Sequence, residues 1–172
     1  VVFVQLGSPS EPTTKALRKY LRKFLGDPRV VDINPWLWKI ILNFFVLPFR
    51  PKKSAKLYAR IWDGKSFPLI TNTRDFTKNV EKELKEIDPE SYVEVNHAFL
   101  LSPPYVNEVY DSWEDDLKKG VGATKLLVIP MFPQYSESTI ASGIDALAKE
   151  LSKRVKIPTF EVITNFHRTH AF

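Results

Sequence analysis

The sequence predicts an α/β fold in which helices cover an open parallel sheet, and three observations support this. Short apolar runs alternate with longer amphipathic segments from about residue 92 onward. Residues 126–129 form an apolar run without polar alternation, which is typical of a strand buried on both faces. Strand–helix–strand alternation with helices of about 15 residues implies parallel strands joined by right-handed crossovers. We therefore expect one domain with a substantial core.

The first part of the chain is expected to begin with a buried strand and to continue in helices. Residues 1–6 form a short apolar run that ends at Gly7, which predicts a strand followed by a tight turn. Thr13 or Thr14 can cap a helix that ends at Gly26, because apolar residues recur there at helical spacing. Basic residues fill the opposite face, which is more typical of a solvated helix surface than of a nucleic-acid site.

Residues 35–49 are apolar nearly all round, with only Lys39 and Asn43 as polar exceptions. The segment is too short to span a bilayer. It is either a core helix or an exposed apolar edge that touches a membrane or an apolar ligand. Taken alone, the segment favours the core helix and leaves the exposed edge open.

The remaining elements are predicted from caps and periodicity. Residues 50–62 begin a helix with Pro51 in its first turn and place cations beside aromatic residues. A further helix is expected from Thr71 or Thr73 to about Ile87. The pattern then predicts strands at residues 92–95, 126–129 and 160–163, and helices at residues 104–119 and 136–155.

The loop after residues 126–129 is a candidate ligand site. Pro130 ends the strand, and in open α/β sheets ligands bind at the carboxyl ends of the strands. An ordinary strand-to-helix connection with a packed tyrosine explains the loop equally well. The loop offers flat faces and hydrogen-bonding groups in Phe132, Gln134, Tyr135, Ser136, Ser138 and Thr139.

The composition and the absence of several sequence motifs exclude or disfavour some classes of function. The chain has no cysteine, which excludes disulfides and cysteine-ligated metals within it. The net charge of +5 permits an anionic partner, and no glycine-rich phosphate motif follows a strand. His167 and His170 have helical spacing, but such a pair without a third ligand is more often incidental than metal-binding. No signal-peptide pattern is visible at Val1, so we expect a cytoplasmic location.

Three motifs resemble the amino-terminal half of ferrochelatase. They are LGSP at residues 6–9 followed by KYLRKFLGDPRVV at residues 19–31, then LPFRPKKSAKLY at residues 47–58, and FPQYSEST at residues 132–139. The resemblance covers almost all of residues 1–172 in order. It implies a flavodoxin-like or Rossmann-like three-layer lobe of a two-lobed chelatase, with the second lobe absent from this chain.

The resemblance implies a lyase that inserts ferrous iron into a porphyrin, the last step of haem biosynthesis. The porphyrin would be protoporphyrin IX or coproporphyrin, iron would be a substrate, and no cofactor would be required. Glu137 stands where some members carry a cluster-ligating cysteine, so no iron–sulfur ligand is expected here. The family's catalytic His and Glu would lie outside this chain, which alone should be inactive. The alternative is a non-catalytic tetrapyrrole-binding module of the same fold.

The resemblance also assigns residues. Trp36 and Leu37 would belong to an apolar lip over the porphyrin cleft that is often apposed to a membrane, which favours the exposed edge over the core helix. Leu6 would lie below the bound metal without coordinating it. Arg50, Lys53 and Tyr58 would contact propionates or line the pocket. Two departures affect the porphyrin pose: Phe67 replaces a frequent serine, and residues 99–103 differ from the usual pattern.

Overall fold

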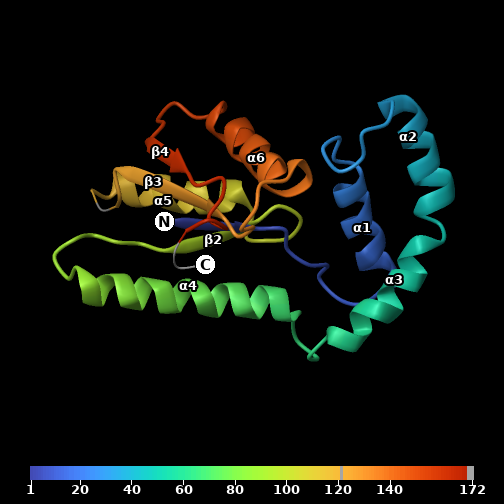
Figure 1. The fold of residues 1–172 in the computed structure, drawn as a ribbon, viewed down its shortest axis with the longest axis horizontal. Coiled ribbons are helices and arrows are strands. Elements are labelled where there is room, and N and C mark those ends of the chain that lie inside the picture. Colours follow the sequence, from blue (N-terminus) through green and yellow to red (C-terminus); the bar gives the residue numbers. More distant parts are fainter. Residues whose placement is uncertain (121, 170–172) are drawn as a thin grey trace.

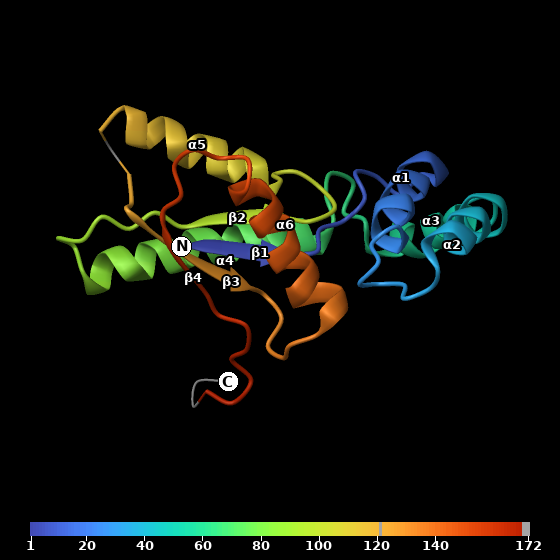
Figure 2. The same cartoon turned by 90° about the horizontal axis from the view of Figure 1, so that it is seen from above.

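The computed structural model describes residues 1–120 and 122–169 and shows a three-layer α/β lobe with a helical extension (Figure 1). Strands β1 (Val2–Gln5), β2 (Asn96–Phe99), β3 (Lys125–Pro130) and β4 (Thr159–Val162) form a parallel sheet in the order β2-β1-β3-β4. Helix α4 (Pro68–Ile87) covers one face, and α5 (Val106–Lys118) and α6 (Ser142–Leu151) cover the other (Figure 2). The predicted fold class is confirmed.

Alternate residues of the central strands serve the two faces of the sheet. Val4 and Val128 are buried against Trp113 of α5 and Leu147 of α6. Phe3 points the other way, and its ring lies 5.1 Å from that of Phe76 in α4. Val128 and Pro130, on one face of β3, are buried, whereas Leu127 and Ile129, on the other face, are only half-buried, so the expectation that β3 is buried on both faces is met fully on one face only.

One strand lies later in the chain than expected. Residues 92–95 were expected to form it, but β2 begins at Asn96, whose main-chain N–H donates to the Val1 carbonyl at 2.8 Å. Main-chain pairing with β1 determines where β2 begins and ends, since Asn96 pairs with Val2 and Ala98 with Val4. Because β2 is an edge strand, polar residues such as Asn96 are tolerated in it, and the apolar pattern placed the strand too early.

Two helices also differ from their expected bounds. Helix α4 starts at Pro68 instead of Thr71 or Thr73, because proline suits the first helical position. The expected helix at residues 136–155 is divided into a wide π-helical turn, Glu137–Ala141, and α6, which ends at Leu151.

A helical extension projects from the carboxyl end of the strands (Figure 1). It contains α1 (Thr14–Leu25), α2 (Pro35–Ile41), a π-helical turn (Leu42–Val46), α3 (Arg50–Tyr58) and a 3-10 turn (Ala59–Ile61). Thr13 caps α1, since its hydroxyl accepts from the Ala16 N–H at 3.2 Å. The extension has its own hydrophobic cluster, made of Tyr20, Leu21, Leu25, Leu42 and Leu47.

The apolar segment of the extension is exposed. Helix α2 has no buried residue, and the exposed fractions of Trp36, Phe44 and Phe49 are 79%, 71% and 73%. Of the two interpretations left open for residues 35–49, exposure is therefore confirmed for α2 and for the phenylalanines after it, whereas Leu42 and Leu47 are buried in the cluster of the extension. Contact of this exposed edge with a membrane or an apolar ligand stays a prediction. In the described residues, no helix combines the length and apolar character needed to cross a membrane.

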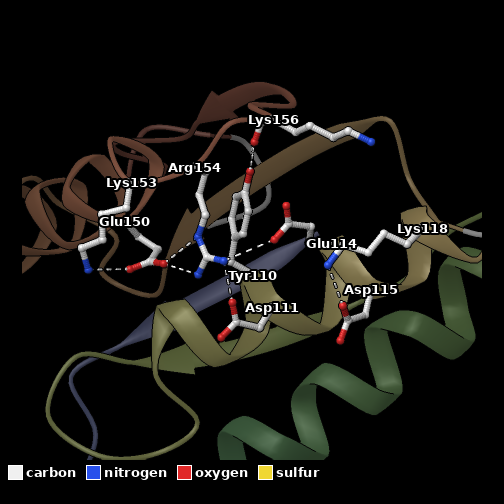
Figure 3. A network of polar contacts seen from close by, with 9 residues as sticks. All are labelled: Tyr110, Asp111, Glu114, Asp115, Lys118, Glu150, Lys153, Arg154 and Lys156. Atoms are coloured by element: carbon white, nitrogen blue, oxygen red, sulfur yellow. Dashed lines mark hydrogen bonds and ion pairs between the residues drawn. The ribbon is translucent and has the colours of Figure 1, made fainter.

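A charged cluster joins α5 to the end of α6 (Figure 3). Arg154 lies between Glu150 and the α5 carboxylates Asp111 and Glu114, at 2.6 Å from Asp111 and 3.3 Å from Glu114. Its guanidinium also lies 4.8 Å from the centre of the Tyr110 ring. Glu150 is buried, so this cluster neutralises a carboxylate that water reaches poorly.

Candidate functional site

The carboxyl edge of the sheet is where the predicted site residues begin. Gly7 turns the chain after β1 with φ of 91°, a conformation that favours glycine. Its carbonyl accepts from the Tyr20 hydroxyl at 3.4 Å, which ties the turn to α1. The Leu6 carbonyl accepts from the Leu101 N–H at 3.0 Å. Leu6 is thus half-buried between the loops that follow β1 and β2, at the edge that faces the extension.

The loop after β3 is held at both of its ends. The Met131 N–H donates to Val4 at 2.8 Å, and the Pro133 carbonyl accepts from the N–H groups of Phe166 and His167, each at 3.0 Å. Phe132 is half-buried, and Tyr135 is 51% exposed. These rings therefore do not point into a closed core, which leaves them available to a ligand.

The polar residues of this loop lie at the start of the π-helical turn. The Ser136 and Thr139 hydroxyls hydrogen-bond to each other, and the Ser136 carbonyl accepts from the Ile140 N–H at 3.0 Å. Ser138 is half-buried and Gln134 is exposed. The structure thus brings Gln134, Ser136, Ser138 and Thr139 together on one short surface segment, as their sequence order requires.

The two predicted anchor cations are both exposed. Arg50 and Lys53 lie in the first turn of α3, and neither forms an ion pair within the described part of the chain. The buried residues of this helix are Pro51 and Ala55, so the cations lie away from its packed side. Unpaired cations beside exposed aromatic surface suit an amphipathic anion.

Tyr58 and Phe67 belong to an aromatic cluster between α1 and α4. The Tyr58 ring contacts Phe67 edge-on at 5.5 Å and Tyr20 at 6.1 Å. Burial, followed by the charge and hydrogen bond of Tyr58, raises the pKa of Tyr20, which keeps its hydroxyl protonated. Phe67 is fully buried, so the departure at this position fills the core instead of adding a polar group to the surface.

An ion pair that the sequence did not indicate links the extension to α6. The Arg29 guanidinium donates twice to the Asp145 carboxylate, once from Nη2 at 2.9 Å and once from Nε at shorter range. The hydrogen bond from Arg29 lowers the pKa of Asp145. The two residues are 116 positions apart in a single sequence, so no periodicity or motif could have paired them.

The histidines provide no metal site in the described residues. Within residues 1–120 and 122–169, no group of three or more His, Asp or Glu side chains could hold a metal ion. His167 Nδ1 lies 3.2 Å from the Pro133 carbonyl. His170, the other member of the predicted pair, lies outside the described residues. The absence of a catalytic residue from this chain remains a prediction.

The structure places the predicted binding residues on two parts of the fold, the carboxyl edge of the sheet and the helical extension. Leu6 and the residues of the β3 loop lie at the edge of the sheet, whereas Trp36, Leu37, Arg50 and Lys53 lie on the extension. Trp36 and Leu37 are exposed, as a lip requires. A single cleft lined by Trp36, Leu37, Phe132 and Tyr135 stays a prediction.

Comparison with known proteins gives a consistent result. The family model for ferrochelatase matches residues 1–172. A ferrochelatase of Idiomarina loihiensis is 43% identical over 167 residues, which cover 97% of this chain and 44% of that protein. A ferrochelatase of Marinobacter nauticus is 38% identical with the same coverage. A coproporphyrin III ferrochelatase of Streptococcus mutans is 38% identical over 100% of this chain and 52% of its own length. The chain thus spans about half the length of the curated relatives it matches.

Proposed function

This chain belongs to the ferrochelatase family, and from that premise we propose that it is the porphyrin-binding lobe of an enzyme that inserts ferrous iron into a porphyrin. The observation that carries the proposal is the match of the family model over residues 1–172. The second lobe would be supplied by the other half of a protein about twice as long. Iron enters as a substrate in this scheme, and no resident cofactor is needed.

The predicted site residues suit a ligand that has a flat apolar ring system and two carboxylates at its edge. The exposed aromatic and aliphatic groups Trp36 and Leu37 would cover the macrocycle, and the faces of Phe132 and Tyr135 would contact it. Gln134, Ser136, Ser138 and Thr139 offer hydrogen bonds at its edge. Leu6 has no donor atom for iron, so a metal near it would be free to pass to the pyrrole nitrogens. Tyr58 would support the pocket wall through its contacts with Tyr20 and Phe67.

Metal insertion releases two pyrrole protons for each iron that enters, so a base within hydrogen-bond reach is required. The described residues offer His97 and His167 as imidazoles, and we propose that neither is that base. Burial lowers the pKa of His97, which lies in β2, away from the loop after β3. The proposal therefore assigns binding to this lobe and proton transfer to the other.

The 172-residue chain is expected to bind a porphyrin without metalating it. An absorbance titration with a free-base porphyrin should show saturable binding, because the contact surfaces named above belong to this lobe. Adding ferrous or zinc ion should then leave the free-base bands in place. Saturable metalation by this chain that is abolished by His170→Ala would show that the chemistry lies here. Binding without metalation by the longer protein would favour a non-catalytic tetrapyrrole-binding module.

Replacing both Arg50 and Lys53 by alanine is expected to weaken porphyrin binding roughly tenfold at low salt, since each cation would pair with a carboxylate. The same variant should lose most of the salt dependence of binding, measured by repeating the absorbance titration at several ionic strengths. Lys52→Ala/Lys56→Ala is the matched control, because it removes the same charge from another side of α3. Equal losses in the two variants would contradict specific anchoring.

The exposed lip has a second proposed role in peripheral membrane contact. Trp36 on α2, Phe44 and Phe45 on the turn after it, and Phe49 at the start of α3 are exposed, with Lys39 and Arg50 nearby in the sequence. Aromatic residues beside cations suit the interface between acyl chains and anionic headgroups. A cytoplasmic protein with such a lip could receive an apolar porphyrin at a membrane surface.

A further inference from the structure

The loop of residues 26–34 joins α1 to the lip and lies beside the start of α6 (Figure 1 and Figure 2). Arg29 belongs to this loop, and Asp145 lies in the first turn of α6, the helix that follows the β3 loop and its wide turn. Among residues 1–120 and 122–169, theirs is the only ion pair that joins the extension to another part of the fold. The Arg29–Asp145 pair thus connects the two parts that carry the predicted binding residues.

The Arg29–Asp145 contact fixes an orientation as well as a distance. Arg29 Nη2 donates to one carboxylate oxygen of Asp145 at 2.9 Å, and Nε donates to the other oxygen. A guanidinium that meets a carboxylate through two parallel hydrogen bonds can rotate little about the contact. While the contact is made, it therefore holds the loop and α6 in one relative placement.

The main chain around Arg29 is itself ordered by Asp27. The Asp27 carboxylate accepts from the Arg29 N–H at 2.8 Å, and the Asp27 carbonyl accepts from the N–H groups of Val30 and Val31 at 3.0 and 3.2 Å. Val30 and Val31 also pack against the hydrophobic cluster of the extension. A force on the Arg29 side chain is therefore passed to an ordered loop and is not absorbed by a slack chain.

The far end of the loop holds the lip. The Asn34 side chain accepts from the N–H groups of Trp36 and Leu37 at 3.0 and 3.3 Å, which caps α2. Trp38 Nε1 donates to the Leu25 carbonyl at 2.6 Å, which ties α2 to the end of α1. The placement of the loop therefore sets the placement of Trp36 and Leu37.

The guanidinium of Arg29 also lies near the β3 loop. The hydrogen bond with Asp145 raises the pKa of Arg29, and the nearby phenol of Tyr135 adds to this effect. Tyr135 is half-exposed and belongs to the predicted ring contacts of the β3 loop. The Arg29–Asp145 pair thus has the lip on one side, through Asn34, and the β3 loop on the other, through α6 and Tyr135.

We propose that Arg29 and Asp145 are positioning residues, which hold the lip at a fixed separation from the β3 loop and thereby raise the affinity for a porphyrin between them. A lip that is already in place loses less conformational freedom when a ligand binds. The two side chains are 38% and 57% exposed, so the pair adds little to the free energy of unfolding and acts through placement. The effect on porphyrin rests on the proposed function, whereas the effect on the separation does not.

A distance measurement tests the placement without any ligand. The chain has no cysteine, so Lys39→Cys on α2 and Lys149→Cys on α6 can carry the only two spin labels. Double electron–electron resonance should give a narrow distance distribution. Arg29→Asp should broaden it and shift it to longer distances, because like charges then face each other, and Asp145→Arg should do the same. Arg29→Asp/Asp145→Arg, which exchanges the two charges, should restore the narrow distribution.

Absorbance titrations with a free-base porphyrin test the consequence for binding. Each single reversal should weaken binding about fivefold, the effect expected of two unit charges in contact in water. The exchanged pair should bind within about twofold of the wild type. Each variant should keep its Tm to within about 2 °C, since the pair is exposed. Lys125→Asp is the matched control, because it breaks the exposed Lys125–Glu161 pair between β3 and β4 and should change neither distance nor affinity.

The two reversals separate placement from direct contact, because they change the net charge in opposite directions. If Arg29 bound a porphyrin carboxylate directly, Asp145→Arg would leave the affinity equal or higher, and that result would overturn the proposal. An unchanged distance distribution in the single reversals would also overturn it, as would an exchanged pair that binds as weakly as they do. A wild-type chain that binds no porphyrin would refute the proposed function instead, and the distances alone would then decide whether the pair places the lip.

Discussion

Replacing Gly7 by alanine is expected to destabilise the fold by about 2–4 kcal/mol, because strain and overlap act at one position. Gly7 has φ of 91°, which disfavours any residue with a Cβ. An added Cβ would lie 2.4 Å from Ser102 Oγ and 3.0 Å from Phe99 Cβ. Phe99 is fully buried and cannot move away cheaply. Urea unfolding followed by circular dichroism measures the loss.

Gly64→Ala separates the two causes of that loss. Gly64 has a similar φ of 96°, but nothing lies within 4 Å of the position of its added Cβ. Its substitution should cost only about 1–2 kcal/mol, which is the conformational part. If Gly64→Ala and Gly7→Ala were equally destabilising, the close contact with Ser102 would have no energetic weight. The Gly7 variant should also lose porphyrin affinity, because Leu6 precedes the disturbed turn.

Replacing Arg154 by leucine is expected to lower Tm by roughly 5–10 °C at neutral pH, since it leaves a buried carboxylate without its main partner. The Glu150 side chain is only 8% exposed, and Arg154 is hydrogen-bonded to it (Figure 3). The remaining partner is Lys153, at 3.0 Å. Lys153→Met is the control, because its exposed ammonium should change Tm by less than about 2 °C. Thermal unfolding of both variants tests the difference.

The Arg154 effect should fade in acid. Burial alone would raise the pKa of Glu150, but hydrogen bonds from Arg154 and Lys153 outweigh it and lower the pKa below the ordinary value of a glutamate, 4.5. A lowered pKa contributes stability above about pH 4.5 that is lost as the pH falls through the folded-state value. The Tm difference between wild type and Arg154→Leu should therefore shrink between about pH 5 and pH 3. A constant difference would assign the loss to packing against Tyr110.

Local sequence signals predicted the parts of the fold that local physics decides. Thr13 was one of the two candidate caps because a cap hydroxyl acts only three residues away, and the parallel sheet followed from alternating strands and helices. The β2 strand was misplaced because main-chain pairing with β1, not side-chain hydrophobicity, selects Asn96–Phe99. The wide turn at Glu137–Ala141 has no composition that distinguishes it from an ordinary helical start.

The candidate site was predictable only where its residues are neighbours in the chain. The β3 loop carries its ring and hydroxyl groups in consecutive order, so their common location needed no knowledge of the fold. The link between Arg29 and Asp145, and the approach of Ser8 to Ser102, depend on how distant segments meet. A single sequence contains no record of such contacts. Composition alone pointed away from the exposure of Trp36, because an all-round apolar segment favours a core helix.

The separate hydrophobic cluster of the extension makes it a distinct cooperative unit. The cluster of Tyr20 and Leu42 shares no buried residue with that of Val4 and Val128, and Leu101 alone joins it from the loop after β2. Local opening of a segment costs only the contacts that the segment itself buries. The extension is linked to the sheet by Leu101, by the contact of Tyr58 with Phe67 and by the hydrogen bond from Tyr20 to Gly7. Outside these contacts, we expect the amides of the extension to exchange with water at a lower free energy of opening than those of the sheet. Hydrogen exchange that reports equal protection of α1 and of β1 would contradict a separate opening of the extension.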